Sequence, residues 1–96
     1  MWQGKKISWH RPNLSVRLEG KSAMLDLDGE QVHCAFPLKA QAAGKTWALG
    51  VPVDQLQQSE VDIYVFEANE DGDAFMLSQA PEAGFEAMIR SISTVE

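Results

Sequence analysis

The sequence predicts an α+β domain in which an antiparallel meander of about seven strands curls into a half-open barrel closed by a C-terminal helix. Two observations predict the sheet. Apolar residues alternate with polar ones along much of the chain, and two-residue turn signals separate the alternating runs. A third observation, an apolar stripe with helical spacing near the C-terminus, predicts the helix.

The most regular alternation covers residues 14–18, 23–27 and 32–36. A two-residue turn at Asp28-Gly29 sets Leu25 opposite Val32, and a similar turn at Gly20-Lys21 sets Val16 opposite Leu25. All the apolar residues of these runs then share one face, whereas a slip of one residue would scatter them over both faces. We therefore expect three strands joined by two tight hairpins.

The first strand is expected over Lys5 to His10, with Ile7 and Trp9 facing the core. Residues 10–13 are expected to form a four-residue turn, because Pro12 fixes the backbone φ angle that such a turn needs. This turn would set Ile7 opposite Val16 in the following strand.

The next segments are less regular. The fourth strand is expected to end near Leu38, where Pro37 favours fraying or an edge position. Residues 39–44 suit a helical turn or a polar loop, Thr46–Val51 a short strand, and Pro52–Gln58 a brief helical turn.

The last hairpin joins Val61–Ala68 to Ala74–Gln79, and a turn at Asp71-Gly72 would pair Phe66 with Leu77. Both of its faces are apolar, so both should be covered. The helix expected over residues 81–93 supplies one cover. Its apolar stripe consists of Phe85, Met88, Ile89 and Ile92.

The 96 residues suit a single domain spanning 1–96, with a β-rich part over 5–79 and the helix over 81–93. The lone Cys34 lies on the predicted core face, which favours a buried apolar role over a reactive one. A cytoplasmic protein is expected because no signal peptide or membrane-spanning segment is visible.

Charge is unevenly distributed in this chain of net charge −6. The basic residues are concentrated in residues 1–21 and the carboxylates in 22–96. The predicted meander places Lys6, Arg17 and His33 in one outward row, where like charges oppose one another. This row is the candidate site for an anion or an acidic partner.

No catalytic or metal-binding pattern is evident, so no enzyme activity, metal or cofactor is expected. The acidic loop 67–73 lacks the bidentate glutamate of a calcium loop, and the outward row containing Ser8, Ser15 and Asp26 lacks a histidine. A pI near 4.8 argues against nucleic acid as a partner, because an acidic surface repels phosphates.

The function expected by elimination is that of a small non-catalytic binding protein, a homodimer or an adaptor, whose uncovered apolar surface drives self-association. One alternative is a binder of a small apolar or anionic ligand with a pocket between sheet and helix. That pocket would be lined by Trp47, Tyr64, Phe66, Phe85 and Met88. Another alternative is an acidic inhibitor that mimics nucleic acid.

Overall fold

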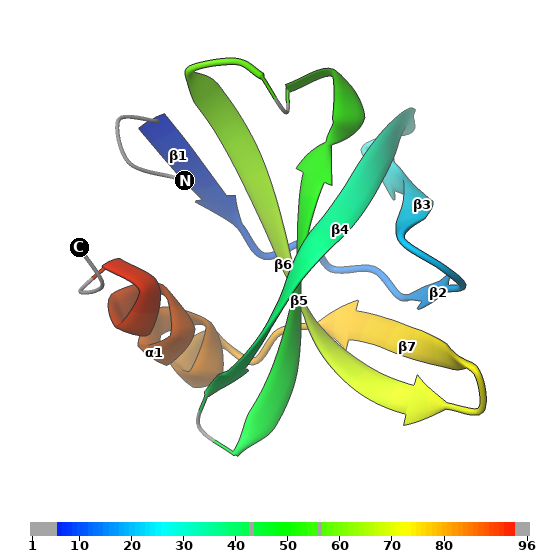
Figure 1. Cartoon of the computed structure of the whole chain (residues 1–96), viewed down its shortest axis with the longest axis vertical. Coiled ribbons are helices and arrows are strands. Elements are labelled where there is room, and N and C mark those ends of the chain that lie inside the picture. The colour runs from blue at the N-terminus through cyan, green and yellow to red at the C-terminus, as the bar shows by residue number, and fades with distance from the viewer. Residues whose placement is uncertain (1–5, 43, 56, 94–96) are drawn as a thin grey trace.

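A computed structural model describes residues 6–42, 44–55 and 57–93 (Figure 1). It confirms the predicted fold class: seven strands form a nearly closed barrel, with one C-terminal helix. The strands are β1 (Lys6–His10), β2 (Val16–Leu18), β3 (Ser22–Leu27), β4 (Glu30–Ala42), β5 (Lys45–Pro52), β6 (Glu60–Asp71) and β7 (Ala74–Gln79). The 3₁₀ turn η1 covers Val53–Gln55, and the helix α1 covers Glu82–Ser93.

The strand order explains how the barrel nearly closes. Neighbouring strands follow the order β2-β7-β6-β5-β4-β3, and each of these pairs is antiparallel. The two ends of this path, β2 and β3, contact each other. Strand β1 lies off the path and pairs with β6 in parallel.

The β3–β4 hairpin has the register that the sequence predicts. Leu27 pairs with Glu30 and Leu25 with Val32. Asp28 and Gly29 have φ angles of 53° and 84°, as the two central positions of a type I′ turn require. Here the turn signal and the alternation together determined the pairing.

The two preceding hairpins were predicted wrongly. Ile7 pairs with Val61 of β6 instead of Val16, and Val16 pairs with Leu77 of β7 instead of Leu25. Alternation specifies which face of a strand is buried but not which strand lies beside it. The long strand β6 offers a free edge to β1, so the local meander is replaced by contacts between distant segments.

Strand β4 continues to Ala42, so the helical turn or loop expected over residues 39–44 is wrong for the described part of that segment. The expected strand Thr46–Val51 lies within β5, and η1 provides a short helical turn within Pro52–Gln58.

The β6–β7 turn lies one residue later than predicted, so Phe66 pairs with Gln79 and not with Leu77. Gly72, with a φ of 67°, lies in the turn between the paired residues Asp71 and Ala74. The register of β7 against β6 is therefore displaced by two residues, so each side chain still lies on the face of the sheet that was predicted for it.

Two apolar clusters lie on opposite faces of the sheet. The barrel interior contains Leu18, Leu25, Cys34, Phe36, Ala48, Phe66, Ala68 and Leu77. The second cluster, between the outer face and α1, contains Trp47, Leu49, Val51, Val61, Ile63, Val65, Ala80 and Met88. Phe85 and Ile89 pack against this second cluster, as the helical stripe predicts, whereas the side chain of Ile92 lies outside the described residues.

Candidate functional site

The sheet divides where β5 and β6 part. Their ladder runs from Gly50–Tyr64 to Trp47–Glu67, but the hairpins that contain them continue further, to the closing pairs Ala42–Lys45 and Asp71–Ala74. The β4–β5 and β6–β7 hairpins therefore diverge, as Figure 1 shows. We call this region, between Lys45–Thr46 of β5 and Ala68–Asp71 of β6, the open fork.

The hydrogen-bonding pattern of the hairpins determines which backbone groups face the open fork. The pair that closes a two-residue hairpin exchanges both backbone hydrogen bonds, and alternate residues then point their N–H and C=O groups the other way. Because Asp71 closes the β6–β7 hairpin, the backbone groups of Glu70 face the open fork. Lys45 likewise belongs to the closing pair of the β4–β5 hairpin, so the backbone groups of Thr46 face the open fork.

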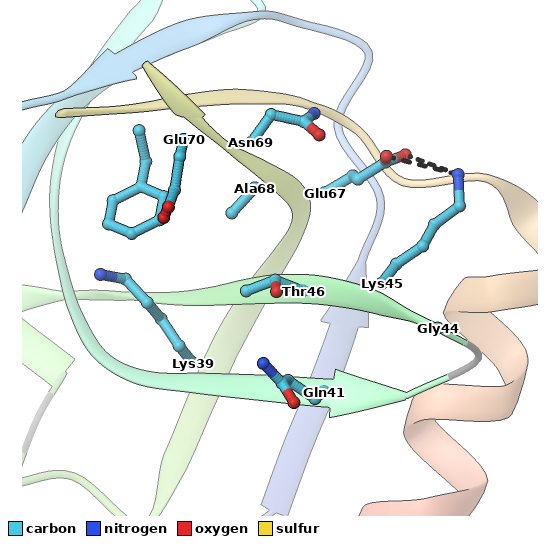
Figure 2. Close-up of a pocket in the computed structure, with 10 residues that line it drawn as sticks. Lys39, Gln41, Gly44, Lys45, Thr46, Glu67, Ala68, Asn69 and Glu70 are labelled. Carbon is cyan, nitrogen blue, oxygen red and sulfur yellow. Dashed lines mark hydrogen bonds and ion pairs between the residues drawn. The ribbon is translucent and has the colours of Figure 1, made fainter. Parts of the chain in front are cut away.

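A hollow of about 680 Å³ occupies the open fork, at one end of the barrel interior (Figure 2). Its walls carry charged, amide and hydroxyl side chains together with one aromatic ring. The lining residues are Lys39, Gln41, Gly44, Lys45, Thr46, Glu67, Ala68, Asn69, Glu70 and Phe75.

A β-bulge places Lys39 in this hollow. Strand β4 has one residue more than β5 between Ala35 and Leu38, where the register shifts. Before the bulge Phe36 lies in the barrel interior, whereas after it Lys39 lies opposite Ala48, another interior residue. Bulges redirect side chains in this way. Because of this bulge, the side chain that faces the barrel end is the cation Lys39 and not the next residue of the apolar alternation.

The charges in the hollow are only partly paired. Lys45 Nζ lies 3.3 Å from a carboxylate oxygen of Glu67. Lys39 Nζ instead lies 3.7 Å from the centroid of the Phe75 ring, a cation–π contact between β4 and β7. Figure 2 shows Lys39 extending toward the side of the hollow where Glu70 lies. Within the described residues, the carboxylate of Glu70 has no ion pair or hydrogen bond.

The opposite end of β6 also extends beyond the β5–β6 ladder, but there side chains of the chain itself cover the backbone at Asp62. Asp62 donates its backbone N–H to Gln55 Oε1 at 2.7 Å, and Gln55 Nε2 donates to Asp62 Oδ2 at 3.1 Å. Gln55 belongs to η1, so this turn covers the edge of β6 with one carboxamide. We call this region the closed fork.

His10 completes the closed fork. Its Nε2 lies 2.9 Å from the other carboxylate oxygen of Asp62, and its ring stacks on Tyr64 with centroids 4.9 Å apart. The hydrogen bond with His10, followed by the one from Gln55, lowers the pKa of Asp62. Burial raises the pKa of Tyr64. This group connects β1 to η1 and β6, which lie far from β1 in the sequence.

The row of Lys6, Arg17 and His33 is not assembled, because the first two hairpins do not form. Lys6 lies opposite Glu60 on β6, and His33 lies opposite Met24 on β3. Arg17 is on β2 and forms 2.7 Å ion pairs with Glu19 and Asp71, which also raise its pKa. The charge repulsion that motivated this candidate site is therefore absent between Lys6 and Arg17.

The five residues proposed to line a pocket do not surround one cavity. Tyr64 and Phe66 pack with the barrel interior, whereas Trp47, Phe85 and Met88 belong to the cluster beneath α1. Trp47 and Met88 are fully buried, and their side chains help to fill the space between sheet and helix.

The residues that line the open fork were missed, although one sequence signal pointed there. Pro37 within a strand indicates a bulge or an edge, and a bulge would reverse the faces of the residues after it. No group of three metal-binding side chains is found in the described ranges, and none of their helices is long and apolar enough to cross a membrane. Comparison of the chain with protein-family models, curated proteins and solved structures found no match.

Proposed function

We propose that this chain is a small non-catalytic interaction protein that binds an extended segment of a partner protein in the open fork. The observation that carries this proposal is the difference between the two ends of β6. Gln55 covers the backbone at Asp62, while the backbone at Glu70 faces a hollow of about 680 Å³.

Exposed strand edges bind extended peptides through main-chain hydrogen bonds, and nearby side chains supply specificity. The open fork offers both elements. Thr46 and Glu70 direct backbone groups into it from opposite walls, and Lys39 and Gln41 add a cation and an amide. A polar wall of this kind suits a peptide better than a purely apolar ligand.

Net charge adds a second argument for the partner's chemistry. The chain carries a net charge of −6, whereas the lining of the hollow contains two lysines and two glutamates. Long-range attraction therefore favours a partner segment with basic residues, with an effect that weakens as salt is added.

The test is a selection of phage-displayed random twelve-residue peptides on the folded protein, followed by calorimetric titration of an enriched peptide. Thr46→Pro removes the N–H that faces the open fork, whereas the matched variant Thr46→Val keeps it and preserves the side-chain shape. We expect Thr46→Pro to weaken binding at least about tenfold and Thr46→Val to change it less than about threefold, as loss of one hydrogen bond implies.

The binding site is mapped on the wild-type protein by amide NMR shifts, so the test does not depend on Thr46→Pro folding. Shifts centred on Thr46 and Glu70 support the proposal. Failure to enrich any peptide, or shifts centred on the β3–β4 turn, would overturn it. Doubling of the mass in light scattering, with the same shifts in the absence of peptide, would assign the open fork to a second copy of this chain instead.

The two other functions considered from the sequence, small-molecule binding and nucleic-acid mimicry, stay predictions.

A further inference from the structure

The two ends of β6 present the same pair of groups, a backbone N–H and an acidic side chain, and the bonds at Asp62 show what such a pair can bind. Asp62 and Glu70 are both acidic, and both lie on the strand face that includes Phe66 and Ala68 of the barrel interior. They are eight positions apart, an even offset, so their backbone groups also lie on the same edge of β6. The closed fork therefore serves as an internal example of how this edge is bound.

At the closed fork the bound group is a primary carboxamide. The Gln55 oxygen accepts from the Asp62 backbone N–H at 2.7 Å, and its nitrogen donates to the Asp62 carboxylate at 3.1 Å. A primary amide can make both bonds at once because its oxygen and one of its N–H bonds point to the same side. A trans peptide bond cannot, since its N–H and C=O point in opposite directions.

Glu70 presents the same two groups, a backbone N–H facing the open fork and a carboxylate without a described partner. We propose that Glu70 binds the side-chain amide of a glutamine or asparagine in the partner segment, in the manner of Gln55 on Asp62. This inference rests on the proposed function and adds to it the chemistry of one anchoring residue.

The other side chains of the hollow are compatible with this ligand. Lys39 is held over the Phe75 ring and Lys45 against Glu67, so neither cation is bonded to Glu70. A neutral amide donates one N–H to this carboxylate and leaves it ionised. The carboxylate can then accept a charge-assisted hydrogen bond, stronger than one between neutral groups.

The experiment uses two small probes on the isotope-labelled protein. Propionamide carries the primary amide of a glutamine side chain, whereas N-methylpropionamide carries a trans secondary amide of similar size. We expect propionamide to shift the Glu70 amide resonance in a saturable manner, and N-methylpropionamide to shift it at least about fivefold less at the same concentration. Equal responses to the two probes would overturn the inference.

Two variants locate the response. Glu70→Ala should abolish the propionamide shifts at the open fork, and Glu60→Ala, at an exposed position of the same strand, should leave them unchanged. Gln55→Ala vacates the closed fork and should create a second saturable response at Asp62. A response at Asp62 in Gln55→Ala without any response at Glu70 in the wild type would refute the inference at Glu70.

The outcome is separable from that of the proposed function. If enriched peptides bind at the open fork but show no preference for glutamine or asparagine, and propionamide fails, only the role of Glu70 is refuted. If propionamide binds while no peptide does, the peptide proposal is refuted.

Discussion

The indole of Trp47 occupies the space that a side chain on Gly84 would need. A Cβ built on Gly84 would lie 2.5 Å from Cη2 of Trp47 and 2.7 Å from Cζ2. Trp47 is fully buried on the outer face of β5, and Gly84 lies in the first turns of α1. The glycine that weakens the helix as an isolated segment thus lets the helix approach the sheet closely.

Gly84→Ala should therefore destabilise the protein although alanine is the better helix former. The gain in helix propensity is about 1 kcal/mol, but overpacking against a buried ring costs typically about 1–3 kcal/mol. Urea denaturation gives the free energy of unfolding. Ala83→Gly, at the exposed neighbouring position, serves as the control and should lose about 1 kcal/mol through propensity alone. A more stable Gly84→Ala variant would show that the helix is not seated on Trp47.

Leu25→Asp and Asp26→Leu should have very different effects. Leu25 is fully buried in the barrel, so an unpaired carboxylate there should cost at least about 3 kcal/mol or prevent folding. Asp26 is exposed, and its carboxylate accepts a 3.2 Å hydrogen bond from the Gly29 N–H, so its loss should cost about 1 kcal/mol. Circular dichroism during urea titration compares the two variants, and equal losses would contradict the β3–β4 register.

The closed fork should contribute to stability in a pH-dependent way. Because the pKa of Asp62 is lower in the folded chain than its ordinary value of 3.8, its bonds stabilise the fold above that value. The contribution is lost as pH falls through the lowered pKa. The stability advantage of the wild type over Asp62→Asn should therefore shrink between pH 5 and pH 2.

Urea unfolding at each pH measures this difference. Asp73→Asn, in the exposed β6–β7 turn, controls for the general loss of a negative charge. If the difference in unfolding free energy between wild type and Asp62→Asn grew toward low pH, the lowered pKa of Asp62 would be contradicted.

Cys34 should resist alkylation while the protein is folded. Burial, followed by the nearby charge of Asp54, raises the pKa of its thiol from 9.0 to about 11. The thiolate is the reactive form, so labelling by iodoacetamide at pH 8 should be at least about a hundredfold slower than that of glutathione. In guanidinium chloride the two rates should become similar. Rapid labelling of the folded chain would place Cys34 on an accessible surface.

The sequence predicted those parts of the fold in which the pairing partners are neighbours in the chain. Leu25 meets Val32 because Asp28 and Gly29 determine the turn between them. The barrel class and the helix also followed from periodicity. The partners of β1 and β2 did not, since Trp9 pairs with Ile63 and Val16 with Leu77 across long sequence separations. Alternation contains no information about such partners.

Two features prevented prediction of the candidate site from the sequence: the bulge in β4 and the divergence of β5 and β6. The bulge between Ala35 and Leu38 reverses the alternation, so Lys39 points into the barrel end where periodicity alone places it outside. Glu70 and Lys39 lie in one hollow only because β5 and β6 pair centrally and then part. No local sequence pattern predicts where two neighbouring hairpins diverge.

Backbone hydrogen exchange tests the central claim, that one end of β6 is closed and the other is open to a peptide. In the free protein, the amide of Asp62 should be protected by Gln55, while that of Glu70 should exchange at close to the rate of an unstructured peptide. Saturation with an enriched peptide should slow exchange at Glu70 at least about tenfold and leave Asp62 unchanged. Strong protection of Glu70 in the free chain, or no added protection with the peptide bound, would contradict the account.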